Sequence, residues 1–193
     1  KGTRGGAVHA TLTLRFGDAA SLAGSGEVAD AVAALLDKGT PTRTRQQVQD
    51  ELDRLKTEFG FHNTPGRLSV SISSRREHFA DAVALLAELL RNPAFPPEAL
   101  DELQRQSLSG IEQQRKEPEA VAEIALARHG DPYPRGDVRH ARNFDEMAQD
   151  VSALSVDKLR AFHQRFYGAG HAEFGAAGDI DMAPLRQALE RGF

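Results

Sequence analysis

Within residues 7–16, which read AVHATLTLRF, apolar and polar side chains alternate without a break from Val8 to Phe16. A period of two places the apolar side chains on one face of a β-strand and the polar side chains on the other. Residues 68–72 repeat this alternation after the turn residues 63–66. Because residues 59–62 precede the same turn, they and residues 68–72 form a predicted hairpin. The pattern predicts an antiparallel sheet that is buried on one face.

Segments with helical periodicity follow and separate these strands. Thr44, with Gln47 three residues later, has the spacing of a helical capping box. Gly39 is expected to end the helix that begins at residue 26, because glycine is favoured just beyond a helix C-terminus. The expected helices cover residues 26–39, 45–59, 76–91, 98–116, 119–128 and 182–191, with one more that begins at Ser155, and a last strand covers residues 171–177.

Helices and hairpin-connected strands alternate along the chain, which favours an α+β fold with an antiparallel sheet and helices packed against it. The chain has 193 residues, of which 40% are hydrophobic, and this suits one domain, or one large domain with a small appendage. Residues 129–143 (HGDPYPRGDVRHARN) have no periodicity. For the polar loop Asp131–Asp137 within this segment we expect a plain connection, although a peptide- or partner-contact role stays open.

The charge balance excludes some classes of partner. The net charge is -4 at pH 7 and the pI is about 6.0, so the chain lacks the basic footprint of a nucleic-acid-binding protein or of a protein that binds anionic membranes. No apolar run approaches the ~20 residues that cross a bilayer. The chain has no cysteine, which excludes disulfides and thiolate ligands. Because it begins with Lys1, we expect a piece of a longer protein.

No self-contained active site is evident in the residue pattern. The acidic residues between Glu112 and Glu123 alternate with basic and amide residues, so a solvated helix face is expected there. No two histidines are three or four residues apart, so no helix presents a pair of imidazoles to a metal. We therefore expect ordinary surface or partly buried roles for His9, His62, His78, His129, His140, His163 and His171.

Several stretches, taken in order, resemble one family, the pitrilysin/insulinase-type zinc peptidases, or inverzincins. The segment AVHATLTLRFGDAASLAGSG is similar to the family's first core strand and the loop after it. The resemblance implies the family's α+β unit, in which helices pack on one side of an antiparallel sheet. The other similar segments are DKGT with TRTRQQVQDELDRL, RREHFADAVALLAELLRNPAFPPEALDELQRQ, DPYPRGDVR and LSVDKLRAFHQRFYGAGHAEFGAAGDID.

Catalytic units of this family carry an inverted zinc motif, H-x-x-E-H, in the first helix. Counting back from residues 38–40, the first histidine position falls on Asp30, the glutamate on Ala33 and the second histidine on Ala34. The region of the third ligand falls at Ser109–Gly110, with Glu112 close by. Since alanine can neither ligate zinc nor accept a proton from water, the resemblance implies no catalytic residue and no metal in this unit. Zinc is expected in a sister catalytic unit.

The resemblance also implies tandem copies that close a chamber around a peptide. Residues 1–193 are therefore expected to be one degenerate repeat unit of a longer bacterial zinc metalloendopeptidase, similar to the third unit of four-copy envelope proteases and located in the periplasm or envelope. Its partners would be sister units and peptide substrate, without nucleic acid or membrane insertion. The sequence identifies no substrate-binding residue; Tyr133 and Arg135 cannot be matched to the pair that binds substrate in other units.

Three alternatives remain open at this stage. The unit could bind zinc through other residues, and metal analysis decides this. It could be a subunit that pairs with a separate catalytic chain, which the length of the native gene decides. It could also be a peptide- or protein-binding module with no proteolytic partner.

Overall fold

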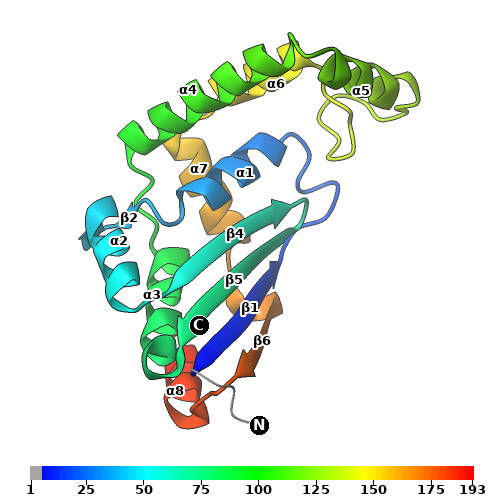
Figure 1. Cartoon of the computed structure of the whole chain (residues 1–193). Coiled ribbons are helices and arrows are strands. Elements are labelled where there is room, and N and C mark those ends of the chain that lie inside the picture. Colours follow the sequence, from blue (N-terminus) through cyan, green and yellow to red (C-terminus); the bar gives the residue numbers. More distant parts are fainter. Residues whose placement is uncertain (1–5) are drawn as a thin grey trace.

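The computed structural model describes residues 6–193, in which a four-stranded sheet is backed by helices (Figure 1). The strand order is β4-β5-β1-β6, and every neighbouring pair is antiparallel. A separate two-stranded hairpin joins β2 and β3. The strands are β1 (Ala7–Arg15), β2 (Gly39–Thr40), β3 (Arg43–Thr44), β4 (Glu58–Thr64), β5 (Arg67–Arg75) and β6 (Ala172–Gly178).

Eight α-helices and two short 3-10 turns complete the described residues. The long helix α4 crosses one end of the molecule and leads to α5, which projects away from the sheet (Figure 1). The helices are α1 (Gly26–Leu35), α2 (Arg45–Arg54), α3 (Phe79–Arg91), α4 (Pro97–Gln114), α5 (Pro118–His129), α6 (Phe144–Ser152), α7 (Val156–Phe166) and α8 (Met182–Gly192), and the turns are η1 (Arg76–His78) and η2 (Ala169–His171).

The main core lies between one face of the sheet and helices α1, α3 and α7. Val8, Leu12 and Leu14 of β1 are buried, whereas the intervening His9 and Thr11 are exposed. The alternation in the sequence therefore marks the two faces of the strand, as predicted. The predicted fold class, α+β with an antiparallel sheet and helices on one face, is confirmed.

The other face of the sheet is open. Small and polar side chains line it, among them Thr11, Ser71, Ser73 and Gly175, and they border a shallow concavity of about 730 Å³. None of the helices in residues 6–193 covers this concavity (Figure 1). The sheet is thus amphipathic, with an apolar face for the core and a hydroxyl-rich face toward solvent.

The predicted end of the first helix at Gly39 is wrong. Helix α1 ends at Leu35, and Gly39 has a φ of 129° as it enters the β2–β3 hairpin. Glu88 of α3 holds this hairpin, because its carboxylate accepts hydrogen bonds from Thr40 Oγ1 at 2.8 Å and from Arg43 Nε at 3.1 Å. This contact joins residues more than 40 positions apart, so the local sequence does not reveal it.

Helix α2 begins as predicted and ends earlier. Thr44 Oγ1 accepts a hydrogen bond from the Gln47 backbone, and Gln47 Oε1 accepts one from the Thr44 backbone, which confirms the capping box. The helix ends at Arg54, and Lys56 has a positive φ of 47° that turns the chain into β4. Phe59 packs against the same cluster as the helix's apolar residues, but from β4 rather than from the helix.

Among residues 6–193, no helix combines the length and the hydropathy that a membrane crossing requires.

Candidate functional site

The zinc-motif positions lie on α1, which packs on the core side of the sheet and against α7. Asp30 and Ala34 are exposed and, being four residues apart, share one face of the helix. Ala33 is buried, with 5% of its surface exposed, and belongs to the main core. The exposed face of the helix therefore carries the Asp30 carboxylate and the Ala34 methyl group, while the Ala33 methyl group faces the core.

Asp30 makes a specific contact inside the molecule. Its Oδ1 accepts a hydrogen bond of 2.8 Å from Nδ2 of Asn63, which is near the end of β4. Tyr167, which follows α7, is near enough to feel the Asp30 charge: burial, and after it the negative charge of Asp30, raises the pKa of the Tyr167 hydroxyl. Asp30 thus links the helix of the frame to the sheet.

These residues do not fit a zinc ion. Neither alanine has a donor atom, and within residues 6–193 no group of three or more histidine, cysteine, aspartate or glutamate residues is arranged to hold a metal. Ser109 is exposed on α4, with Gly110 next to it. Glu112 pairs with Arg115 Nε at 3.3 Å on the same helix. Asp30 and Glu112 are thus paired with other side chains, and the alanine, serine and glycine at the remaining positions carry neither a carboxylate nor an imidazole.

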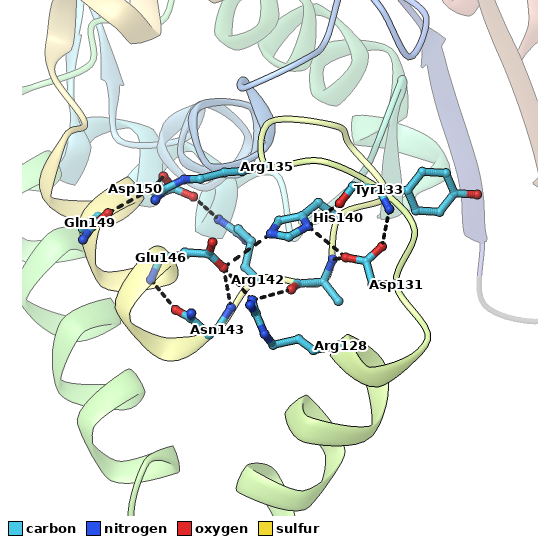
Figure 2. Close-up of polar contacts among 11 residues, drawn as sticks. Arg128, Asp131, Tyr133, Arg135, His140, Arg142, Asn143, Glu146, Gln149 and Asp150 are labelled. Carbon is cyan, nitrogen blue, oxygen red and sulfur yellow. Dashed lines mark hydrogen bonds and ion pairs between the residues drawn. The ribbon is translucent and has the colours of Figure 1, made fainter.

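A network of charged and polar side chains occupies the segment between α5 and α6 (Figure 2). His140 lies between two carboxylates, with Nδ1 2.8 Å from Asp131 Oδ2 and Nε2 3.4 Å from Glu146 Oε2. Backbone amides of Tyr133 and Ala141 lower the pKa of Asp131, and the backbone amide of Asn143 lowers the pKa of Glu146. Both carboxylates are therefore held in the charged form that attracts the imidazole.

Arg142 ties this network to the helix of the zinc-motif frame. Its Nη1 lies 2.8 Å from Glu27 Oε2 in the first turn of α1 and 3.2 Å from Asp150 Oδ2 in α6. The network, α1 and α6 border a polar cavity of about 360 Å³. The segment that we predicted to be a plain connection is a polar brace between α5, α6 and α1.

Tyr133 and Arg135 do not form a joint site. The guanidinium of Arg139 stacks over the Tyr133 ring, 3.9 Å from its centroid. Arg135 reaches the other way, to Gln149 Oε1 at 3.0 Å, and Figure 2 shows the two side chains on opposite sides of the network. The structure therefore gives no reason to pair these two residues in substrate binding.

Helix α6 is an element that sequence reasoning missed. Asn143 Oδ1 accepts a hydrogen bond from the Glu146 backbone, and Glu146 Oε2 accepts one from the Asn143 backbone, both at 2.8 Å. This is a complete capping box, and the spacing N-x-x-E was the sequence signal that could have revealed the helix.

Residues 27–131 match the family model of the insulinase peptidases, family M16. The chain belongs to the M16 peptidase family. The matched region begins at Glu27 in the first turn of α1 and includes the zinc-motif frame. Three segments of the sequence resemblance, which lie between residues 37 and 106, fall within it.

Solved structures agree with this M16 assignment in fold. A peptidase M16 inactive domain from Pseudomonas fluorescens superimposes with a TM-score of 0.81 at 22% identity, covering 95% of this chain and 44% of that chain. A protease from Helicobacter pylori gives 0.80 at 12% identity, covering 100% and 46%. The ferredoxin protease FusC, in complex with Arabidopsis ferredoxin, gives 0.71 at 16% identity, covering 98% and 20%.

The M16 chain described here spans less than half the length of each of these solved chains. No curated protein sequence matched it.

Proposed function

We propose that this M16 unit is a non-catalytic domain of a longer zinc metalloendopeptidase. In this proposal it docks to the catalytic unit and forms part of the wall of the peptide-binding chamber. The observation that carries the proposal is the content of the zinc-motif frame, where Asp30 is hydrogen bonded to Asn63 and positions 33 and 34 are alanine. The structural similarity to a chain described as an M16 inactive domain supports it.

The open face of the sheet supports the role of a chamber wall. It offers hydroxyl groups of Thr11, Ser71 and Ser73 beside the small Gly175. Such a surface can exchange hydrogen bonds with a polypeptide without holding one apolar side chain in place. The sheet edge formed by β4 offers backbone groups for pairing with an extended peptide.

Zinc loading of the purified chain tests this proposal. After incubation with zinc and desalting, we expect no retained metal and no cleavage of a mixed peptide library. The positive control is a catalytic M16 unit with an intact H-x-x-E-H motif, treated in parallel, which shows that the assay detects bound zinc and cleavage. One equivalent of tightly held zinc in the unmodified chain would overturn the proposal.

The length of the gene product decides whether the catalytic unit lies in the same polypeptide or in a separate chain. A longer product with a second M16 unit places the catalytic site in the same polypeptide. A product of about this length that co-purifies with a catalytic M16 chain makes this unit a separate subunit. A product that purifies with neither is a stand-alone binding module and contradicts the proposal.

A further inference from the structure

The imidazole of His140 lies between two carboxylates, one on each side of the ring (Figure 2). On one side, Nδ1 is 2.8 Å from Asp131 Oδ2 and 2.9 Å from the backbone oxygen of Tyr133. On the other side, Nε2 is 3.4 Å from Glu146 Oε2 and has no hydrogen-bond partner among residues 6–193. The side chains of His140, Asp131 and Glu146 are at most 15% exposed, so solvent does little to screen these contacts.

Only the doubly protonated ring suits both of its sides. A neutral imidazole has one N–H donor and one nitrogen that acts as an acceptor. With its proton on Nδ1, the neutral ring turns the Nε2 lone pair toward Glu146, and with its proton on Nε2 it turns the Nδ1 lone pair toward Asp131. Both carboxyls stay charged while an imidazole titrates, because backbone N–H donors lower the pKa of Asp131 and the pKa of Glu146. Loss of one ring proton therefore replaces an attraction with a repulsion.

The charges around the ring favour the same doubly protonated state. They come from α1, α5, α6, α7 and the segment that carries His140, and each belongs to the network or lines the polar cavity beside it. Among the described residues, six carboxylates and five permanent cations meet these criteria, so a charged His140 balances the set. The carboxylates are Glu27, Asp30, Asp131, Asp137, Glu146 and Asp150, and the cations are Arg128, Arg135, Arg139, Arg142 and Lys158.

The partners of His140 also hold the C-terminal end of α5. Glu146 Oε2, which faces His140, accepts a hydrogen bond of 2.9 Å from Arg128 in the last turn of α5. Asp131, the partner on the other side of the ring, follows two residues after the end of that helix. Helix α5 has no buried residue, and its partly buried apolar contacts lie before its last turn. The position of its C-terminal end therefore depends on polar contacts that meet at His140.

We propose that His140 is a pH-sensitive clamp on the C-terminal end of α5. With both ring protons present, His140 bridges Asp131 and Glu146 and fixes the segment between α5 and α6. When one proton is lost, the repelled carboxylate moves away from the ring, and the end of α5 and this segment become mobile. Arg142 passes the change to α1, because its guanidinium joins Glu27 of α1 to the segment. The ordering is present at the lower pH and is lost as the pH rises, and it does not depend on the proposed function.

Hydrogen exchange of the 193-residue chain at about pH 6 and about pH 8, on either side of the range in which imidazoles titrate, tests the clamp. Rates are divided by the intrinsic exchange rate at each pH, and the amides of α3 are the internal reference. At the higher pH we expect protection in the last turn of α5 and in residues 137–142 to fall roughly tenfold, as for the loss of one hydrogen bond to a charged group. Ring ¹⁵N shifts of His140 should show the loss of a proton over the same pH interval. Protection that does not follow the ring protonation overturns the clamp.

Three variants separate His140 from other sources of pH dependence. His140→Gln has no titratable ring and should leave the end of α5 weakly protected at both pH values. Glu146→Gln keeps an acceptor for the capping box but removes the charge that faces Nε2, so it should reduce the pH effect at least twofold even if His140→Gln fails to fold. His129→Gln is the matched control, because an imidazolium at the last residue of α5 also interacts with the helix dipole, and the pH effect should persist in it. A pH effect that survives in His140→Gln, or that disappears in His129→Gln, belongs to another group and contradicts the proposal.

Discussion

Asp30 is a residue of the zinc-motif frame with a visible structural role. We predict that Asp30→Ala lowers the free energy of unfolding by about 1 kcal/mol, because it removes one hydrogen bond and leaves the Asn63 amide without its partner. Urea denaturation measures the change. Asp101→Ala on α4, also an exposed aspartate, is the control, and we expect a change within ~0.5 kcal/mol. Equal effects of the two substitutions would show that the Asp30 contact contributes nothing.

Asp137 gives a prediction on pH dependence. Hydrogen bonds from the Arg139 side chain, and then from its backbone amide, lower the pKa of Asp137 from 3.8 to about 2. A lowered pKa in the folded state means that the carboxylate contributes stability above the unfolded pKa and loses this contribution as the pH falls from about 4 to about 2. Asp137→Asn should therefore reduce the fall in urea midpoint between pH 5 and 2.5. If the fall is no smaller than in Asp101→Asn, the Arg139 contact does not stabilise the fold.

The residues of the site differ in how far the sequence can reveal them. The positions of Asp30, Ala33 and Ala34 follow from the family resemblance, by counting back from residues 38–40. The partner of Asp30 does not, because Asn63 is 33 residues away and becomes a neighbour only when β4 lies beside α1. Arg142 and Glu27 are 115 residues apart, so their ion pair is also a product of the tertiary fold.

Among the secondary-structure elements, local signals predicted the strands and most helices. Alternation identified β1 and β5, and side-chain capping identified the start of α2 at Thr44. One element depends on more than local signals, and another was missed although its capping box was a local signal. The β2–β3 hairpin is held by Glu88 of α3, which overrides the tendency of Gly39 to end a helix. Helix α6 is short and follows an irregular segment, so its apolar pattern alone is weak.

The N-terminal cap of helix α6 is expected to contribute to the stability of the fold. Asn143→Ala removes the side chain that accepts the Glu146 amide, and we expect a loss of about 1 kcal/mol in the free energy of unfolding. Because α6 carries Asp150, a partner of Arg142, hydrogen exchange should also rise in the segment that joins α5 to α6. Asn143→Asp keeps an acceptor at the cap and should recover most of the stability. A loss as large in Asn143→Asp would assign the effect to something other than capping.

At the scale of the whole molecule, the sheet has a closed core on one face and an exposed edge at β6. The core between the sheet and α1, α3 and α7 is closed, with Val8, Val32 and Leu86 fully buried. The edge of the sheet formed by β6 is open, and so is an apolar groove of about 320 Å³ between β6 and α8. The described unit therefore has its own buried core and an exposed sheet edge.

This asymmetry predicts weak self-association of the isolated chain. Bare β6 edges of two molecules can pair with each other, and the exposed Met182 gains by burial in such a contact. Sedimentation equilibrium should show an apparent mass that rises with concentration, and Met182→Asp should reduce the rise because it brings two carboxylates together at a paired edge. Leu126→Asp, on α5, should not reduce it. A monomer that is independent of concentration would show that the edge is protected in some other way, and association abolished by Leu126→Asp alone would move the contact to α5.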